Sequence, residues 1–145
     1  MTIFIGADHR GFNLKNQIIE YLHEKDIRIE DLGAYQYDPV DDYPDFAKKV
    51  AQAVLQNPEN HLGIVICGSG AGVVIAANRY KGVRAALAIN ESQAIHIREN
   101  DHVNILGLAA DITPFQQAAL IIEAFLKAQP KQEEKYLRRI NKLDQ

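Results

Sequence analysis

The fold is decided by residues 62–72, which read Leu-Gly-Ile-Val-Ile-Cys and then Gly-Ser-Gly-Ala-Gly. The first part, Leu62 to Cys67, is a continuous apolar run with the length of one strand. Such runs are typical of parallel strands that are covered on both faces. The glycines turn the chain, and a helical pattern follows from Val73 to about Asn78. A strand, a glycine turn and a helix in this order predict one unit of an open parallel sheet.

The same alternation continues on both sides of this stretch. Further strands are expected over 3–5, 27–32, 83–89 and 103–108, and helices over 14–22, 44–54, 114–126 and 131–143, with one more starting after Asn90. Asn90 has Gln93 at the capping-box position, and Thr113 precedes Pro114 as a predicted cap. We therefore expect a single α/β domain over 1–145, with a five-stranded parallel sheet, helices on both faces and an extra C-terminal helix.

The composition excludes several classes of protein. The 145 residues are 47% apolar and 24% charged, which is the profile of a globular domain. A net charge of −3 argues against a nucleic-acid binder. A membrane span needs about 18 consecutive apolar residues, and no run in the sequence is that long. The first residues lack the basic segment with which a signal peptide starts. The single cysteine cannot form an internal disulfide, so we expect a protein of the reducing cytoplasm.

The end of the 62–67 strand carries the strongest chemical signal. Ligands of open parallel sheets bind beyond the carboxyl ends of the strands. Here Cys67 is followed by glycines, whose backbone N–H groups can turn toward a negative charge together with the start of the next helix. That field favours the thiolate form of a neighbouring cysteine. A base beside a stabiliser of negative oxygen suits proton abstraction next to a carbonyl, whereas the plainer interpretation is a cysteine that only packs at a strand end.

The glycine turn has other interpretations. It is not a phosphate-binding P-loop, because no Gly-Lys-Ser/Thr follows. It reads Gly-x-Gly-x-Gly, and Glu91 lies where a dinucleotide-binding domain often holds a ribose, so a nicotinamide-binding domain stays possible. A turn that serves only tight packing is the third interpretation.

Other polar residues are weaker candidates on their own. Asp8 and His9 follow the first strand and could bind hydroxyl or phosphate groups, or simply cap a helix. The basic residues of the last helix, among them Lys135 and Arg139, could hold phosphate or form a solvated face. No histidine pair has the spacing of a zinc site, and we expect no metal.

Taken together, these residues resemble the ribose-5-phosphate isomerase B family, which is grouped with the galactose-6-phosphate isomerase subunits. The resemblance runs in the same order along nearly the whole chain and is carried by the segments Ile3–Gly11, Asp42–Pro44, Ile66–Gly72 and Ala76–Arg79. It implies a Rossmann-like three-layer α/β/α fold. It also implies a homodimer or homotetramer whose active sites are shared between subunits. The implied reaction is an aldose–ketose isomerisation of a sugar phosphate through a cis-enediolate, without cofactor or metal, and its leading pair is ribose 5-phosphate and ribulose 5-phosphate.

The resemblance also implies roles for individual residues. Cys67 would be the base. Ser69, which stands where the family commonly has Thr, would assist at the ring oxygen or the carbonyl oxygen of the sugar. The enediolate would be held by the backbone N–H groups of the turn, which come from Gly68, Gly70, Ala71 and Gly72. Asp8 and His9 would bind the substrate and Tyr43 would line the pocket. On the last helix, Lys135 and Arg139 align with two phosphate-binding arginines.

Three departures from the family bear on these roles. Asn100 stands where the family often has the histidine that opens the sugar ring, and Asp101 replaces an asparagine that helps to hold the anion. Asp111 replaces a phosphate-binding arginine, which would weaken phosphate binding by like-charge repulsion. We therefore expect His102 to be a candidate for ring opening. The alternatives are a different sugar substrate and a sugar-phosphate-binding protein without activity.

Overall fold

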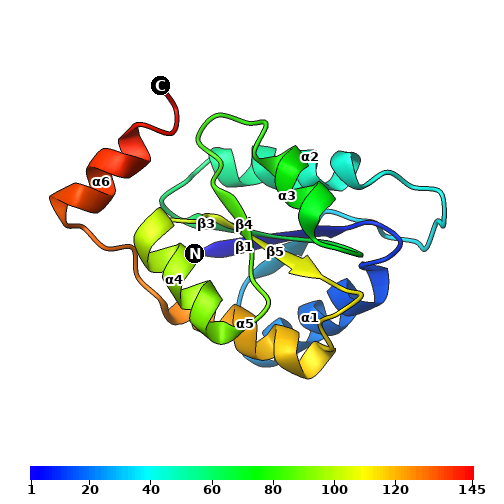
Figure 1. Ribbon diagram of the computed structural model, residues 1–145. Helices are drawn as coiled ribbons and strands as arrows, with labels where there is room; N and C mark the ends of the chain where they lie inside the picture. The colour runs from blue at the N-terminus through cyan, green and yellow to red at the C-terminus, as the bar shows by residue number, and fades with distance from the viewer.

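In the computed structural model, which describes residues 1–145, five parallel strands form one sheet of order β2-β1-β3-β5-β4 (Figure 1). The predicted fold class is confirmed. The strands are β1 (Thr2–Ala7), β2 (Ile29–Asp31), β3 (His61–Cys67), β4 (Ala85–Leu87) and β5 (Ile105–Ala109). The chain order reverses between β1 and β3, so the crevice where such sheets bind ligands lies beyond the carboxyl ends of these two strands.

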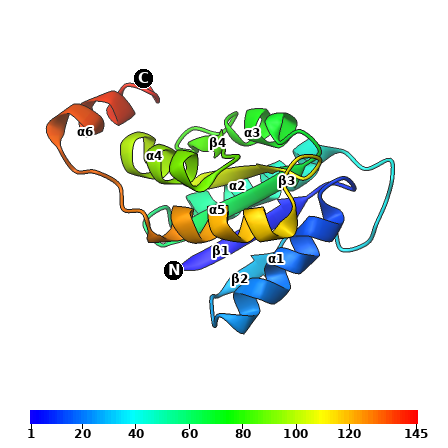
Figure 2. The same ribbon diagram turned by 60° about the horizontal axis from the view of Figure 1, so that its bottom comes forward.

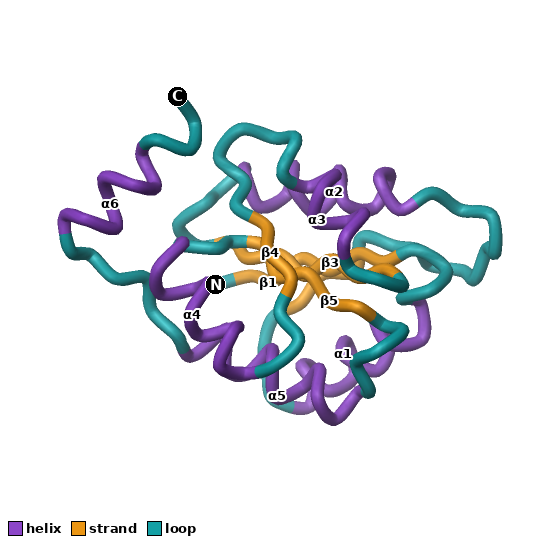
Figure 3. The backbone as a smooth tube through the Cα atoms, viewed as in Figure 1, coloured by secondary structure: helices purple, strands orange, loops and turns teal.

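Helices cover both faces of the sheet (Figures 1 and 3). One face carries α2 (Tyr43–Leu55) and α3 (Ala71–Ala77), and the other carries α1 (Phe12–Glu24), α4 (Glu91–Asp101) and α5 (Phe115–Lys127). No helix is long and apolar enough to cross a membrane.

The core consists of two apolar clusters, one on each face of the sheet. The larger one joins the sheet to α1, α4 and α5, and the smaller one joins it to α2 and α3. Glycines let the helices of the smaller cluster come close to the strands, because a Cβ on Gly63 would lie 2.6 Å from Val50 Cγ1 and a Cβ on Gly107 would overlap Val74. The apolar run of β3 is buried from Leu62 to Cys67, as the sequence predicts for a central strand.

Most predicted local signals are found in the structure, with two corrections. Asn90 caps α4 by accepting the Gln93 N–H at 2.8 Å, although the Gln93 side chain bonds the N–H of Ile89 rather than that of Asn90. The predicted Thr113 cap is wrong. Thr113 is buried, Pro114 occupies the cap position, and no side chain bonds the first turn of α5.

The last helix, α6 (Glu134–Asn141), is shorter than the predicted 131–143 and has no buried residue. Figures 1 and 2 show it standing away from the body of the domain, on the side of α4. A helix that buries none of its side chains against its own domain is held weakly in the single chain.

Candidate active site

The turns that follow β1 and β3 lie side by side at the reversal of strand order. The two strands pair in parallel up to Ala7 and Ile66, and the Asp8 N–H donates to the Ile66 carbonyl at 3.3 Å. This pairing brings Asp8 and His9 next to the glycine turn, as the sequence predicts.

The glycine turn presents unpaired backbone donors. The N–H groups of Gly68, Ser69 and Gly70 make no hydrogen bond within the chain, and the Ser69 hydroxyl accepts the Ala71 N–H at 3.3 Å. Gly70 has φ +74°, a left-handed conformation that favours glycine, and it starts α3. Unpaired N–H groups at this place can donate hydrogen bonds to a negatively charged oxygen.

The carbonyl groups at this place are held by the turn after β5. Ala110 N–H donates to the Cys67 carbonyl at 2.9 Å and Asp111 N–H donates to the Gly68 carbonyl at 3.0 Å. The turn is therefore fixed from the side of the carbonyls, which leaves its N–H groups as the free polar edge.

Cys67 is less accessible than the proposed chemistry requires. Cys67 is 5% exposed and packs in the smaller apolar cluster, between the sheet and helices α2 and α3. It lines none of the five cavities of the chain. The thiol therefore lies beside the free N–H groups in sequence and in space, but the single chain has no open pocket over it.

A third residue, Asp41, lies next to Asp8 and His9, although the sequence did not single it out. One oxygen of Asp8, which is 4% exposed, accepts the N–H groups of Arg10 and Gly11 at 3.0 and 3.2 Å. Asp41 Oδ1 accepts the His9 backbone N–H at 2.9 Å and lies 2.7 Å from His9 Nδ1. This fixes the imidazole and leaves His9 Nε2 without a partner in the chain. The acidic loop that holds Asp41 was visible in the sequence, but its contact with a residue 32 positions away was not.

Asp8, His9 and Asp41 each have one atom of a metal-ligating type, and these three atoms lie within 4.8 Å of one another. Asp41 Oδ2 is buried without a hydrogen bond, although Asp41 Oδ1 is already engaged by His9. The hydrogen bonds in the chain fit an orienting carboxylate, which is a common partner of a histidine that binds a ligand.

Aromatic and charged side chains border the two ends of the turn. A Cβ on Gly72 would lie 2.8 Å from Tyr43 Cζ, so the ring of Tyr43 rests against the last glycine, where the sequence predicts a pocket wall. At the first glycine, Gly68, the neighbour is the guanidinium of Arg10, which forms an ion pair with Asp111. Sequence reasoning noted Asp111 but assigned no role to Arg10.

The remaining predicted site residues lie at the opposite edge of the sheet. His102 ends α4 in a left-handed conformation and is 8% exposed. Its Nε2 lies 2.8 Å from the Lys131 carbonyl oxygen, and its own carbonyl accepts Arg84 Nε at 2.9 Å. Asn100 binds Lys131 Nζ at 2.9 Å, and its Nδ2 lies 2.9 Å from Nδ1 of the exposed His96. Asp101, Lys135 and Arg139 are exposed nearby on α4 and α6.

The two groups of residues cannot meet within one chain. Helix α4 runs back from the carboxyl end of β4 to the amino end of β5, so its last residues lie at the amino edge of the sheet (Figure 1). The seven residues of β3 separate the two edges by roughly 20 Å at about 3.3 Å per residue. The structure thus brings together Asp8, His9, Tyr43 and the turn 67–72, and it places Asn100, Asp101, His102, Lys135 and Arg139 apart from them.

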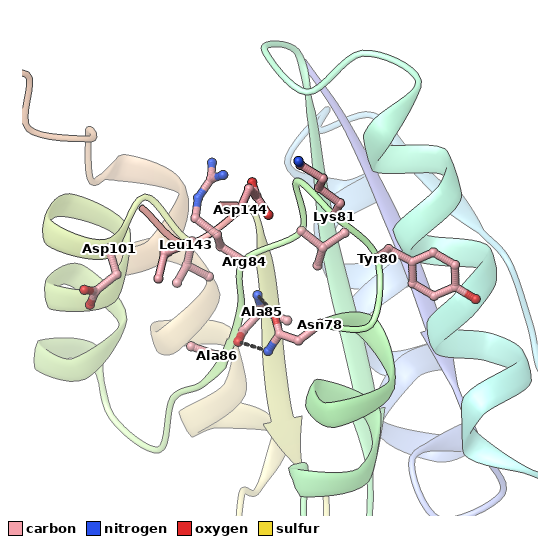
Figure 4. Close-up of a pocket in the computed structure, with 11 residues that line it drawn as sticks. Asn78, Tyr80, Lys81, Arg84, Ala85, Ala86, Asp101, Leu143 and Asp144 are labelled. Carbon is pink, nitrogen blue, oxygen red and sulfur yellow. Dashed lines mark hydrogen bonds between the residues drawn. The ribbon is translucent and has the colours of Figure 1, made fainter. Parts of the chain in front are cut away.

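A cavity of about 350 Å³ lies at this amino edge, between the start of β4, the end of α4 and the C-terminal segment (Figure 4). Asn78 closes its floor by two hydrogen bonds of 2.8 Å with the backbone of Ala85. Burial lowers the pKa of the Arg84 guanidinium that lines it. Asp144 reaches in from the C-terminal segment and accepts the Gly82 N–H at 3.2 Å. The cavity therefore belongs to the edge that carries Asp101, and not to the edge that carries Cys67.

Comparison with known proteins gives a consistent result. The model of the family described as Ribose/Galactose Isomerase matches residues 3–143. A relative named probable ribose-5-phosphate isomerase B from Mycoplasma genitalium is 45% identical over 88% of this chain and 84% of its own length. Ribose-5-phosphate isomerase B from Mycolicibacterium paratuberculosis is 37% identical over 97% of this chain and 88% of its own length.

Solved structures agree with these sequences. The crystal structure of the Mycoplasma genitalium ribose-5-phosphate isomerase B, with bound ribulose 5-phosphate, has a TM-score of 0.94 and 43% identity, and the match covers 98% of this chain and 93% of that one. The enzyme from Thermotoga maritima has a TM-score of 0.93 and 41% identity, with 99% and 97% covered.

Proposed function

Because the chain belongs to the ribose/galactose isomerase family, we propose that it interconverts ribose 5-phosphate and ribulose 5-phosphate by proton transfer between C1 and C2. One observation carries this proposal more than any other. The three unpaired N–H groups of Gly68, Ser69 and Gly70 directly follow the only cysteine of the chain. A base and a set of donors for negative oxygen are the two parts that an enediolate mechanism needs.

In the proposed reaction, the thiolate of Cys67 takes the proton from C2 of the open-chain aldose. The electrons of the broken C–H bond form a double bond between C1 and C2, and the carbonyl oxygen at C1 becomes negative. The N–H groups of the turn stabilise that oxygen, and the Gly72 N–H extends the row of backbone donors, whereas the Ala71 N–H is held by the Ser69 hydroxyl. The thiol then returns the proton to C1 while the hydroxyl proton at C2 moves to the oxygen at C1, assisted by Ser69, which leaves the ketose.

Substrate binding is assigned to side chains at the same edge. Asp8 has one carboxylate oxygen that makes no hydrogen bond in the chain, and His9 has its Nε2 free, so both can bind sugar hydroxyls. Tyr43 forms a wall next to Gly72. These groups can fix the sugar so that its C1 and C2 lie over the turn.

We further propose that a second copy of the chain completes each site, in a homodimer or a larger assembly. The end of α4, with Asn100 and Asp101, lies at the amino edge of the sheet, roughly 20 Å along β3 from Cys67, and α6 with Lys135 and Arg139 stands on the same side as α4. These residues are too far from Cys67 to act on the same substrate within one chain. Helix α6 buries none of its side chains in its own domain, and the buried thiol lacks a pocket. A partner that brings its α4 end and α6 to the carboxyl edge would supply both the missing groups and the missing walls.

For ring opening, the proposed residue is His102, whose Nδ1 makes no hydrogen bond in the chain. The exposed His96, which is bonded to Asn100, is the other imidazole at this edge. Both would act on the site of the partner. The ring-opening residue is the one whose Asn variant loses more turnover on cyclic ribose 5-phosphate than on open-chain ribulose 5-phosphate.

The test of the function follows deuterium from solvent. The protein is incubated with ribose 5-phosphate in deuterated buffer, and NMR follows formation of ribulose 5-phosphate and the label at C1 of the ketose and C2 of the aldose. Cys67→Ala should abolish both while the melting temperature stays near that of the wild type, since a buried cysteine behaves as a small apolar residue. Full exchange in Cys67→Ala would reassign the base, and no exchange in the wild type, despite measurable sugar-phosphate binding, would favour a protein that only binds.

A further inference from the structure

Arg10 lies directly against the glycine turn. It follows Asp8 and His9 after β1, and its guanidinium occupies the space that any side chain at position 68 would need, since a Cβ on Gly68 would overlap Arg10 Cζ and Nε. The absence of a side chain at Gly68 is what lets the cation rest on the start of the turn. An anion that the free N–H groups attract would therefore meet this guanidinium as well.

Asp111 holds the guanidinium in this place. Arg10 Nη2 donates to Asp111 Oδ2, and the backbone N–H of Asp111 donates to the Gly68 carbonyl at 3.0 Å. Asp111, in the turn after β5, thus binds both Arg10 and the glycine turn. Asp111 is paired with a cation at this site, so its carboxylate does not face the substrate as an uncompensated negative charge.

The guanidinium keeps donors for a ligand. Of its five N–H donors, only the one to Asp111 is used within the chain, and the Arg10 side chain is 54% exposed. An ion pair between side chains as exposed as these contributes little to stability. The ion pair between Arg10 and Asp111 therefore adds little to the stability of the fold. The side of the guanidinium that makes no hydrogen bond faces solvent next to the glycine turn.

We propose that Arg10 is a specificity-determining residue that binds the phosphate group of the substrate, with Asp111 as its positioning partner. The proposal rests on the proposed function, because it assumes a phosphorylated sugar at the turn. The planar fork of an arginine matches phosphate oxygens. Arg10 is half exposed, whereas Cys67 is buried, and the reacting carbons need the sheltered end of the site. The exposed Arg10 is therefore a better binding partner for the charged, hydrated phosphate group than for the reacting oxygens of the sugar.

The kinetic test compares Arg10→Gln and Arg10→Lys with the wild type. Arg10→Gln should raise KM for ribose 5-phosphate about ten- to hundredfold and change kcat by less than about threefold, as expected for loss of binding that is equal in ground and transition states. Arg10→Lys should recover only part of the loss, because an ammonium keeps the charge and loses the fork. The matched control is Arg28→Gln, which removes a similarly exposed arginine whose partner is Glu30 at 3.1 Å, on a strand away from the turn.

Direct binding of inorganic phosphate separates this inference from the function itself. Calorimetric titration should show weaker binding of phosphate to Arg10→Gln than to the wild type or Arg28→Gln, whether or not the protein turns over a sugar. Unchanged KM and unchanged phosphate binding in Arg10→Gln overturn the inference and leave the isomerase intact. A fall in kcat at unchanged KM also overturns it, because it would place Arg10 at the reacting oxygens. A wild-type protein that binds phosphate through Arg10 but exchanges no deuterium would contradict the function alone.

Discussion

Asp41 shows how much a single carboxylate decides at the residue scale. Its Oδ1 receives both the backbone N–H and the ring Nδ1 of His9, at 2.9 and 2.7 Å, and its side chain is only 9% exposed. A carboxylate that holds Nδ1 selects the nitrogen that stays available, so Nε2 of His9 is the atom left for the substrate. Asp41 is therefore a positioning residue, since it acts through His9.

Replacing Asp41 should therefore disturb His9 more than the fold. Asp41→Ala should raise KM about tenfold, because an oriented partner of a ligand-binding histidine contributes on this order. Asp41→Asn keeps an oxygen for both N–H groups and should lose less. The 15N NMR signals of the His9 imidazole should change in Asp41→Ala, which a purely structural loss would not produce. The control is Asp38→Ala in the same loop, which removes a side chain whose only hydrogen bond is with the Val40 N–H and keeps the Asp38 carbonyl that accepts the Asp41 N–H. Unchanged His9 signals in Asp41→Ala would remove the positioning role.

Lys15 is a second polar side chain whose surroundings the structure reveals, because it is fully buried. Its Nζ lies 2.6 Å from Asp31 Oδ2 and 5.7 Å from the centre of the Phe12 ring. A buried ammonium persists only where a partner compensates it. Nothing in the sequence around Lys15 distinguishes it from an exposed helical lysine, so its burial could not be predicted from the pattern.

At the scale of elements, α1 and α5 are joined by a polar cluster at the rim of their apolar contact. Glu123 of α5 accepts the Tyr21 hydroxyl of α1, and Lys25 Nζ lies 3.0 Å from the same oxygen, Glu123 Oε1. The hydrogen bond from Tyr21, followed by that from Lys25, lowers the pKa of Glu123 from 4.5 to about 2. The same carboxylate raises the pKa of both Tyr21 and Lys25.

This cluster makes the docking of the two helices sensitive to acid. A carboxyl group whose pKa is lower in the folded state stabilises the fold fully above its unfolded value and loses that contribution as pH falls through the folded value. The contribution of Glu123 should therefore be present above about pH 4.5 and fade toward about pH 2. In denaturant titrations, Glu123→Gln should be less stable than the wild type at about pH 6, and the difference should shrink at about pH 3.

The control for this experiment is Glu134→Gln, which removes a carboxylate that pairs with Arg138 on the exposed face of α6. Its stability should follow that of the wild type at both pH values. A difference between Glu123→Gln and wild type that stays constant from neutral to acid pH would contradict the role of the carboxylate charge.

At the scale of the whole molecule, the fold was predictable and the site only in part. The apolar run of β3 is typical of a strand covered on both faces, and the glycines after it place the turn at a sheet edge, so the strand-end rule found Asp8, His9 and Cys67. Contacts between distant segments were not predictable. Arg10 meets Asp111 across 101 positions, and no local pattern encodes that pair. Thr113 failed as a cap because α5 begins at Phe115, one residue later than predicted, which puts Pro114 in the cap position.

The same scale explains why the predicted site residues divide into two groups. In a parallel sheet, every turn that follows a strand lies at the carboxyl edge of the sheet. Every helix end that precedes a strand lies at the amino edge. Cys67 is the last residue of a strand, whereas Asn100, Asp101 and His102 end a helix, so the topology alone separates them. Spacing along the chain carries no information on a partner copy, and only the pairing of two edges from two chains can unite these residues.

This division leads to a test of the shared site by mixing two inactive proteins. One is Cys67→Ala, which lacks the base, and the other carries Lys135→Ala and Arg139→Ala on α6. Each should be nearly inactive alone. If each site takes its turn from one chain and its α6 from the other, a mixed dimer contains one site with both defects and one with none. Random exchange of subunits should then restore about a quarter of the wild-type sites.

The restored activity should require mixing under conditions that let subunits separate and reassociate, such as dilution from mild denaturant. As a control, Cys67→Ala mixed with Ser69→Ala should regain nothing, because both changes lie in the turn of the same chain. Sites built from a single chain would also give no recovery in the first mixture, and the division of residues between the two sheet edges would then have to be bridged by a movement of α6 within its own domain. The size of the recovered fraction therefore measures directly how many chains contribute to one site.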